Sequence, residues 1–370
     1  MVLLIGNYAL DQQHSMQRFG DLMLAGLRAA GVDAELVRPT PLFGNIFGAR
    51  GLGKWLAYID KHILFPFRLR TQLSRGPSIV HVCDHSNATC IPRKRSTPFV
   101  VTCHDLLAVR GGLGEETDSP ASFTGRFLQR WILRGLHRAD VIACVSSATA
   151  KDAKRLVSGA KIDIVPLALN FDYRKIPPAE ARAILQRLPN FDVDLPFVLH
   201  VGSNLRRKNR EGVLRIFARS QDKWNGRLVF AGEPLSEELN ALAKELGVSH
   251  RVVQIDNPTP ETLRGLYNCA TALLFPSRFE GFGWPIIEAQ ACGCPVICSN
   301  TGPMPEAAGD AGLLHQVDDE EGFVVDLLRL TNADERARWS GKSLQNAQRF
   351  SRERMITRYI DIYRELGAKL

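Results

Sequence analysis

The first half of the chain alternates short apolar runs with amphipathic segments. Apolar runs at residues 2–6, 34–37, 78–83, 98–103 and 140–145 predict buried strands. Segments 15–31 and 123–136 have apolar residues at helical spacing. Strands that alternate with helices are typical of a parallel sheet covered on both faces, so residues 1 to about 170 predict an α/β unit.

A second series of the same kind begins at residue 196. Its predicted strands lie at 196–202, 227–232, 251–255, 272–276 and 295–299. Residues 165–196 contain several prolines around one short helix, which indicates a linker with an insert. The last segment carries Met355, Tyr359, Ile362 and Tyr363 on one helical face and predicts a terminal amphipathic helix. With 370 residues, two doubly wound domains are expected.

Composition narrows the class of protein. Hydrophobic residues make up 45% and charged residues 23% of the chain, as in globular proteins. We expect no signal peptide and no membrane-spanning helix, because no apolar run is long enough. The net charge of +8 favours an anionic partner: nucleic acid, an acidic membrane or a phosphorylated substrate. Nucleic acid is the weakest of these, since no nucleic-acid-binding motif occurs.

Metal and thiol chemistry receives little support from the cysteines. Most of the eight cysteines lie inside apolar runs, where buried reduced thiols are expected. Cys292 and Cys294 bracket one glycine without a second Cys or His pair nearby, which makes a poor zinc site. We therefore assign no metal and no cofactor.

Candidate functional residues are most concentrated in residues 276–299, PSRFEGFGWPIIEAQACGCPVICS. Glu280 and Glu288 stand with seven residues between them, and Gly281, Gly283 and Pro285 lie in that interval. Pro285 suits the first position of a helix, whose mouth would offer backbone N–H groups to phosphate or sugar oxygens. Glu288 would then lie in the first turn and accept hydrogen bonds from sugar hydroxyls. An ordinary N-terminal glutamate is the alternative for Glu288.

Residues 275–314, together with 198–209, 100–105 and 139–156, resemble the retaining glycosyltransferase family 4, the group 1 glycosyltransferases. The resemblance implies the GT-B fold: two Rossmann-like α/β domains and a C-terminal helix, after Phe350, that crosses back to the first domain. It assigns residues 1–170 to an acceptor-side domain, 171–350 to a nucleotide-sugar-binding domain and 351–370 to the crossover helix.

The same resemblance implies roles for the donor-binding residues. Glu288 would bind the nucleotide ribose, and Glu280 would approach the hydroxyls and the reacting face of the transferred sugar. Lys208 would neutralise the diphosphate, whereas a solvated lysine at a helix start is its alternative. Sugar and phosphate oxygens would be held by the backbone amides of Gly281, Phe282 and Gly283.

One departure from the family pattern concerns the turn after residue 202. The family often has an arginine where this chain has Ser203. Arg206 or Arg207 lies within the same turn and is able to grip two phosphate oxygens, and we favour Arg207.

Candidate residues in the first domain come from strand ends. His104, with Asp105, ends a predicted strand, where open α/β sheets bind ligands. A buried, satisfied histidine is the ordinary alternative, but the resemblance favours a contact with a sugar hydroxyl or the backbone at the donor site. His85 has the same geometry.

The loop after the first strand lacks the Gly-x-Gly-x-x-Gly of dinucleotide-binding proteins, which argues against a Rossmann dehydrogenase. The resemblance brings the acceptor to this loop, so the acceptor-side candidates are His14, Ser15 and Arg18. Arg18 is equally compatible with a surface position.

Residues 51–73 mix apolar and basic side chains. They contain Trp55, Ile59, Ile63, Phe65 and Phe67 together with Lys54, Lys61, Arg68 and Arg70. An interfacial membrane helix has this composition, and so does a half-buried helix with extended basic side chains, which we favour.

The resemblance implies a metal-independent, retaining hexosyltransferase of polysaccharide biosynthesis, acting on mannose or glucose type donors. Its partners would be a nucleoside diphosphate sugar, a glycan or lipid-linked acceptor and an anionic membrane surface, with no nucleic acid. It would act in the cytoplasm, peripherally at the inner face of the membrane. We treat the Asp-x-Asp at Asp192 and Asp194 as a chance match to a metal-binding motif. The alternatives are a catalytically silent nucleotide-sugar-binding protein or membrane scaffold, and another GT-B enzyme such as an epimerase or a phosphorylase.

Overall fold

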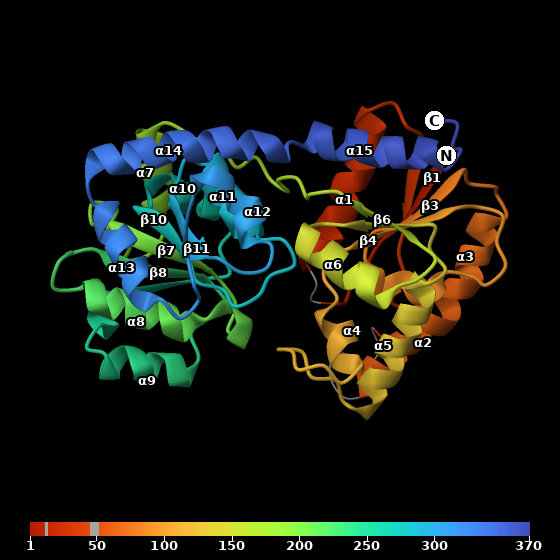
Figure 1. Ribbon diagram of the computed structural model, residues 1–370, viewed down its shortest axis with the longest axis horizontal. Coiled ribbons are helices and arrows are strands. Elements are labelled where there is room, and N and C mark those ends of the chain that lie inside the picture. The colour runs from red at the N-terminus through yellow and green to blue at the C-terminus, as the bar shows by residue number, and fades with distance from the viewer. Residues whose placement is uncertain (12–13, 45–51) are drawn as a thin grey trace. The chain divides into compact units, whose positions relative to one another are not determined.

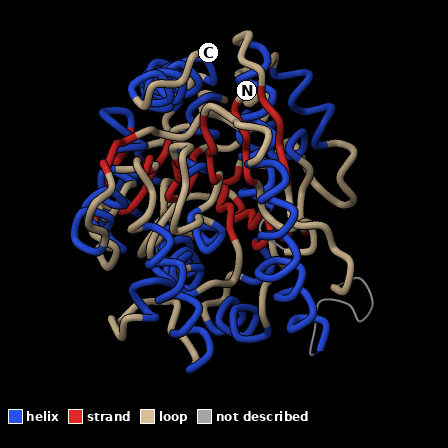
Figure 2. Tube along the Cα trace, turned by 90° about the vertical axis from the view of Figure 1, so that its right-hand side faces the viewer, coloured by secondary structure: helices blue, strands red, loops and turns tan. Residues whose placement is uncertain are grey.

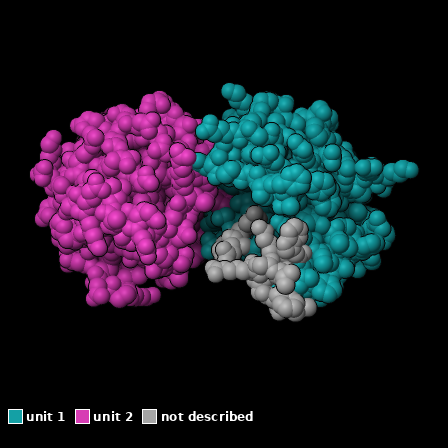
Figure 3. All heavy atoms as spheres, turned by 90° about the horizontal axis from the view of Figure 1, so that it is seen from below, with its two compact units in different colours: residues 1–170, 352–370 teal, residues 171–351 magenta. Residues whose placement is uncertain are grey.

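The chain forms two compact units. A computed structural model describes residues 1–11, 14–44 and 52–370, without the side chains of residues 14 and 52–55. Unit 1 comprises Met1–Asn170 and Arg352–Leu370, and unit 2 comprises Phe171–Ser351 (Figure 1; coloured separately in Figure 3). The segments 1–170, 171–350 and 351–370 stay predictions as functional domains.

Unit 1 is built on a six-stranded parallel sheet. Its strands are β1 (Val2–Ile5), β2 (Ala34–Val37), β3 (Ile79–Val82), β4 (Phe99–Cys103), β5 (Val141–Cys144) and β6 (Lys161–Ile164). They lie in the order β2-β1-β3-β4-β5-β6, and every pair is parallel. The chain therefore adds β2 on one side of β1 and β3 on the other, which places a topological switch point between β1 and β3.

Helices surround this sheet (Figure 2). They are α1 (His14–Ala29), α2 (Leu52–Ile59), the π-helix η1 (Asp60–Leu64), α3 (Phe65–Leu73), the 3₁₀-helix η2 (His85–Cys90), α4 (Leu107–Gly112), α5 (Phe123–Leu136), α6 (Ser147–Leu156) and α15 (Arg352–Glu365). The strands β1, β3, β4 and β5 are fully buried along their length, because both faces of the sheet are covered.

The terminal helix α15 belongs to unit 1, as the crossover prediction requires. The four side chains predicted to share its apolar face are all buried. The hydroxyl of Tyr359 lies 2.7 Å from Thr102 Oγ1, and the hydroxyl of Tyr363 lies 2.6 Å from His81 Nδ1, both on buried strands. A Cβ on Gly26 of α1 would lie 2.5 Å from Ile356, so the two helices meet closely (Figure 1). Buried polar bonds and close packing together fasten α15 to this unit.

Unit 2 repeats the doubly wound design. Its strands are β7 (Phe197–Gly202), β8 (Arg227–Gly232), β9 (Val252–Asp256), β10 (Ala272–Phe275), β11 (Val296–Ser299) and β12 (Gly312–His315). They form a parallel sheet in the order β12-β11-β10-β7-β8-β9. The helices of this unit are α7 (Pro178–Leu185), η3 (Arg206–Lys208), α8 (Arg210–Ser220), α9 (Glu237–Glu245), η4 (Ser249–Arg251), α10 (Pro260–Cys269), α11 (Trp284–Ala291), α12 (Met304–Ala308), η5 (Gly309–Ala311), α13 (Glu320–Arg329), α14 (Ala333–Ala347) and η6 (Gln348–Phe350).

The predicted linker helix is α7, and it packs within unit 2. Ile176, Ala181 and Ile184 are buried and share a cluster with Cys269 of α10. A Cβ on Gly265 of α10 would lie 2.9 Å from Ile184, so glycine permits this close approach. The insert is therefore part of the second unit rather than a free connection.

Residues 52–73 form three consecutive helical segments, α2, η1 and α3. Phe65 and Leu69 are buried, whereas Ile63 is 53% and Phe67 61% exposed. Position 51 and the side chains of Lys54 and Trp55 lie outside the described residues. The half-buried interpretation thus holds for one face of α3, while other apolar side chains remain open to solvent.

None of the helices in the described ranges 1–11, 14–44 and 52–370 is both long and apolar enough to cross a bilayer.

Candidate functional site

In unit 2 the polar candidate residues gather at the point where the strand order of the sheet reverses. The chain runs from β7 outward through β8 and β9, then returns to place β10 on the other side of β7. The carboxyl ends of β7 and β10 therefore flank a topological switch point, the usual ligand crevice of open α/β sheets. Lys208 follows β7 and Glu280 follows β10. Topology thus brings together two residues that are 72 positions apart in sequence.

The loops after β7 and β10 are bonded to each other. Asn209 adopts a left-handed conformation with φ 53°, and its side-chain amide donates to Pro276 O at 3.0 Å. The backbone N–H of Arg278 donates to Arg207 O at 2.7 Å. These bonds hold the η3 turn against the second loop, so the charged side chains of both start from fixed positions.

Glu280 bridges two basic side chains. Its Oε1 lies 2.7 Å from Lys208 Nζ, and its Oε2 lies 2.6 Å from a guanidinium nitrogen of Arg207. Glu280 is 6% and Lys208 9% exposed, so Lys208 is not the solvated lysine of the alternative interpretation. The cluster of Arg207, Lys208 and Glu280, here called the ionic triad, carries a formal charge of +1.

Burial and charge act in opposite directions on the pKa values of the ionic triad. Burial raises the pKa of Glu280, but attraction to Lys208 and Arg207 outweighs it and leaves that pKa below its ordinary value. Burial lowers the pKa of Lys208, and repulsion from Arg207 adds to this, against the attraction of Glu280. Glu280 is therefore a carboxylate at neutral pH.

The N-terminus of α11 follows Glu280 by four residues along the chain. Gly283 precedes the helix with φ 102°, a conformation that a side chain would strain. Phe282 is buried and packs edge-on against Phe350, with ring centroids 5.7 Å apart. Since the first turn of a helix leaves N–H groups without intrahelical partners, this end of α11 is suited to anionic oxygens.

Glu288 corrects one expectation. The helix begins at Trp284, so Pro285 is its second residue and Glu288 its fifth, beyond the first turn. The helix-terminus argument therefore does not apply to Glu288. Glu288 is buried, and its Oε2 accepts a hydrogen bond of 3.0 Å from the Tyr267 hydroxyl. Its charge is near enough to raise the pKa of Lys208.

Ser203 and Arg206 lie in the turn after β7 but do not belong to the ionic triad. Ser203 is half-buried directly after β7, and Arg206 is exposed. Of the two arginines considered for the phosphate contact, Arg207 is the one that contacts Glu280.

The Asp-x-Asp precedes β7 and so lies at the amino ends of the strands, opposite the carboxyl ends where Lys208 and Glu280 lie. Asp192 accepts a hydrogen bond of 2.9 Å from the backbone of Asp194, and Asp194 pairs with Arg182 of α7. Both carboxylates are thus engaged in the local turn, and neither belongs to the ionic triad.

In unit 1 a second polar group lies at the carboxyl ends of β1 and β3, at the switch point of that sheet. The side-chain amide of Asn7 donates to Asp84 at 2.5 Å, and His85 Nδ1 lies 3.2 Å from Asp84. Burial raises the pKa of Asp84, but His85 outweighs it and holds that pKa well below its ordinary value. Asn7 and Asp84 were not among the predicted site residues, although each directly follows a predicted strand, a position that could have identified them.

His104 follows β4 at the same edge. Its Nε2 lies 3.0 Å from Cys83 O, so Nε2 carries the proton and Nδ1 is left as an acceptor. Nδ1 is buried without a hydrogen-bond partner among the described residues. Burial lowers the pKa of His104, which keeps the ring neutral. The satisfied-histidine alternative therefore holds for one nitrogen, and the other is open to a ligand hydroxyl.

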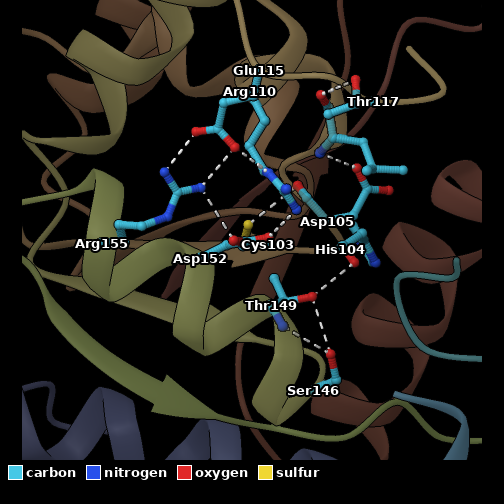
Figure 4. A network of polar contacts seen from close by, with 11 residues as sticks. Cys103, His104, Asp105, Arg110, Glu115, Thr117, Ser146, Thr149, Asp152 and Arg155 are labelled. Atoms are coloured by element: carbon cyan, nitrogen blue, oxygen red, sulfur yellow. Dashed lines mark hydrogen bonds and ion pairs between the residues drawn. The ribbon is translucent and has the colours of Figure 1, made fainter. Parts of the chain in front are cut away.

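The backbone at His104 is fixed by α6 (Figure 4). Thr149 Oγ1 donates to His104 O at 3.5 Å, and Ser146 Oγ lies 3.1 Å from Thr149 Oγ1. Asp105 accepts a hydrogen bond of 3.1 Å from the backbone N–H of Leu107, the first residue of α4. These contacts set the position from which the imidazole projects.

The acceptor-side candidates lie at the start of α1. Ser15 and Arg18 are exposed there, and the side chain of His14 lies outside the described residues. The roles of all the predicted site residues stay predictions.

Two family models match most of the chain. The model described as "Glycosyl transferases group 1" matches residues 182–345, and the model described as "Glycosyltransferase Family 4" matches residues 18–173. O-antigen chain mannosyltransferase B from Escherichia coli is 29% identical over 248 residues, 65% of this chain and 65% of that protein. A D-inositol 3-phosphate glycosyltransferase from Segniliparus rotundus is 31% identical over 289 residues, 74% of this chain and 62% of that protein. The chain thus spans just under two thirds of the length of these curated relatives.

Solved structures share the fold along the whole chain. Sucrose-phosphate synthase from Thermosynechococcus elongatus has a TM-score of 0.77 at 20% identity, covering 99% of this chain and 98% of that one. HepE from Anabaena, in complex with UDP-glucose, has a TM-score of 0.72 at 15% identity, covering 99% and 100%. The two doubly wound units, the returning terminal helix and both family matches agree: the chain belongs to the group 1 glycosyltransferases and has the GT-B fold.

Proposed function

We propose that this protein is a retaining glycosyltransferase that moves a hexose of mannose or glucose type from a nucleoside diphosphate sugar to a glycan or glycolipid acceptor. The observation that carries the proposal is the ionic triad at the switch point of unit 2. Its formal charge of +1, beside the N-terminus of α11, suits a diphosphate. The complex of the similar HepE with UDP-glucose supports this class of donor.

Each member of the triad has a distinct role in this proposal. Lys208 and Arg207 turn from Glu280 toward the diphosphate oxygens when the donor binds. Glu280 is then free to accept hydrogen bonds from hydroxyls of the transferred sugar. Until the donor arrives, Glu280 compensates the buried Lys208 and the half-buried Arg207, whose positive charges would otherwise repel each other. Glu288 accepts hydrogen bonds from the ribose hydroxyls.

The proposed transfer needs no protein nucleophile. The bond between the sugar C1 and the diphosphate oxygen breaks, and the acceptor oxygen bonds to C1 on the same face. Because the new bond forms on the face that the diphosphate leaves, the anomeric configuration is retained. The acceptor proton passes to the leaving diphosphate oxygen. Lys208 and Arg207 stabilise the negative charge that develops on the leaving group. Because these cations neutralise the diphosphate, we propose that transfer requires no metal ion.

His104 contributes its free acceptor nitrogen. With Nε2 donating to Cys83 O, the unpartnered Nδ1 is able to accept a hydrogen bond from a sugar hydroxyl. This role uses the neutral ring, which agrees with the direction of its pKa shift.

We further propose that the protein acts in the cytoplasm at the inner face of the membrane. The positive net charge supports attraction to anionic lipid. Fractionation of cells should recover the protein with membranes at low salt and release it at high salt. Recovery in the soluble fraction at both salt concentrations would reject this location.

Calorimetric titration with UDP, GDP and ADP tests the donor site, and the tightest ligand identifies the donor class. The matching sugar nucleotides are then tested for release of nucleoside diphosphate with and without candidate glycan and glycolipid acceptors. Retention is read from the anomeric proton coupling of the product. Binding without turnover would identify a silent nucleotide-sugar-binding protein, and interconversion of the donor sugar would identify an epimerase. Absence of binding to all three nucleotides rejects the proposal.

A further inference from the structure

Unit 1 contains an apolar pocket that none of the roles above uses. It lies between the segment 58–63, at α2 and η1, and helix α5, and has a volume of about 760 Å³. This volume is within the range of small-molecule sites. One wall of the pocket includes Tyr58, His62 and Ile63, and the other includes Phe123, Phe127 and Trp131.

The aromatic wall is unusually exposed. Phe123, Phe127 and Trp131 follow one another at intervals of four residues on α5, so they share one face of the helix. Phe123 is 89% and Phe127 66% exposed. Ile63 on the opposite wall is 53% exposed. Single exposed apolar residues are common, but a stripe of them along a concave site marks an interaction surface.

A row of arginines runs beside the aromatic stripe. Arg126, Arg130 and Arg134 are also spaced by four residues on α5, and the first two line the pocket. All three are exposed, and none forms an ion pair within the part of the chain that the structure describes. Helix α5 itself contains no acidic residue. The edge of the apolar pocket therefore carries two arginines, Arg126 and Arg130, without an ion-pair partner among the described residues.

The pocket is connected to the crevice of unit 1. Asp60, the first residue of the π-helix η1, accepts a hydrogen bond of 2.8 Å from the Tyr8 hydroxyl, in the loop after β1. His62 Nδ1 lies 3.3 Å from the Thr89 hydroxyl, in η2 after β3. These bonds place one wall of the pocket against the loops at the carboxyl ends of the strands, where Asp84 and His104 also lie. Short π-helical segments occur frequently at functional sites.

We propose that this pocket binds the apolar chain of a phosphorylated lipid, whose phosphate contacts Arg126 and Arg130. The inference deepens the proposed function in one respect: the lipid would be the carrier of the acceptor. A concave apolar site with two free guanidinium groups at its edge suits a single chain with an anionic head. The bonds to the β1 and β3 loops would hold this chain beside the crevice that faces the acceptor.

Direct binding of farnesyl phosphate, measured by calorimetric titration, tests the pocket without requiring turnover. Farnesol serves as the uncharged probe. Phe127→Ser should weaken binding of farnesyl phosphate at least tenfold. The double variant Arg126→Gln, Arg130→Gln should weaken binding of farnesyl phosphate tenfold and leave farnesol unchanged. These side chains are exposed, so thermal unfolding should match the wild type.

Two matched controls come from the same unit. Phe67 on α3 is 61% exposed and does not line the pocket, and Arg134 continues the arginine row beyond it. Phe67→Ser and Arg134→Gln should bind farnesyl phosphate within twofold of the wild type. Equal binding by Phe127→Ser and the wild type would overturn the proposal. So would equal affinity of the wild type for farnesol and farnesyl phosphate.

Vesicles and nucleotides separate the remaining outcomes. If the wild type binds phosphatidylglycerol vesicles but not farnesyl phosphate, and Phe67→Ser and Phe127→Ser lower vesicle binding alike, this face is a membrane contact and the pocket proposal is wrong. Binding of UDP or GDP should be the same in the pocket variants and the wild type. A wild type that binds farnesyl phosphate but no nucleotide would reject the proposed function and support the pocket.

Discussion

Removing the ammonium group of Lys208 is the sharpest test of the donor site. Lys208→Met keeps an unbranched side chain near Phe275, whose ring centroid lies 5.2 Å from Nζ, but removes the charge. If Lys208 contacts the diphosphate, the variant loses one charged hydrogen bond, worth about 1.5–3 kcal/mol. Affinity for the nucleoside diphosphate should therefore fall by about 10- to 150-fold. The transfer rate should fall as well, since the same charge stabilises the leaving group.

Lys208→Met should also lower the free energy of unfolding, but the remaining pair of Arg207 and Glu280 keeps this loss small. Breaking a buried ion pair costs about 3–5 kcal/mol when the remaining charge is left alone. Glu280 keeps Arg207 at 2.6 Å, so the loss should be smaller, about 1–3 kcal/mol. Thermal unfolding of the whole protein measures this loss, and binding is then measured at a temperature where the variant is folded.

Arg206→Ala is the matched control for Lys208→Met. Arg206 lies in the same turn, is exposed, and forms no ion pair with any described residue. Its removal should leave nucleotide affinity within about twofold of the wild type, as expected for an exposed side chain outside the site. Calorimetric titration with UDP and GDP compares the three proteins. Equal affinity of Lys208→Met and the wild type, or an equal loss in Arg206→Ala, would refute the role of Lys208.

Three further predictions concern other groups. Glu288→Gln should lower affinity for the nucleoside diphosphate about tenfold but leave pyrophosphate binding unchanged, because Glu288 is proposed to contact ribose; a parallel loss of pyrophosphate binding would contradict this. Transfer should persist in excess EDTA, and Asp192→Ala with Asp194→Ala should keep wild-type kinetics, whereas activity lost to the chelator and restored by manganese would reject metal independence. Burial lowers the pKa of His81 to about 3, so the unfolded chain binds a proton below about pH 6.5 that the folded chain does not. Between pH 7.5 and 5 the wild type should therefore lose about 2 kcal/mol more stability in urea unfolding than His81→Gln, and equal losses would show that His81 is not buried in its neutral form.

The interior strands were predictable because they are continuous apolar runs. The runs at 78–83, 98–103 and 272–276 correspond to β3, β4 and β10, which are buried on both faces. The strands β6 and β12, which lie at sheet edges, were not predicted from the sequence. In β6 the residues Lys161–Ile164 are exposed or half-buried, so they lack the apolar run that identified the others.

Local motifs predicted which residues of unit 2 to consider as site candidates, but not which of them contact one another. The glycines and glutamates of residues 280–288 were evident as a group, and Lys208 was placed by resemblance. Their pairing required the order of β10 and β7 in the sheet, since a strand's neighbour depends on how the whole sheet assembles. The helix start at Trp284 also moved Glu288 out of the first turn, because Gly283, with its positive φ, precedes the helix.

The sequence by itself determined the class of fold, the two units and the identity of the family, because hydrophobic periodicity and short motifs are local properties of a chain. Only the tertiary structure decided that Glu280 holds both Lys208 and Arg207, and that one nitrogen of His104 is left without a partner. It alone also showed that Phe123 and Phe127 face solvent beside a pocket. Burial and ion pairing depend on neighbours distant in sequence, and an amphipathic pattern does not reveal whether its apolar face is covered.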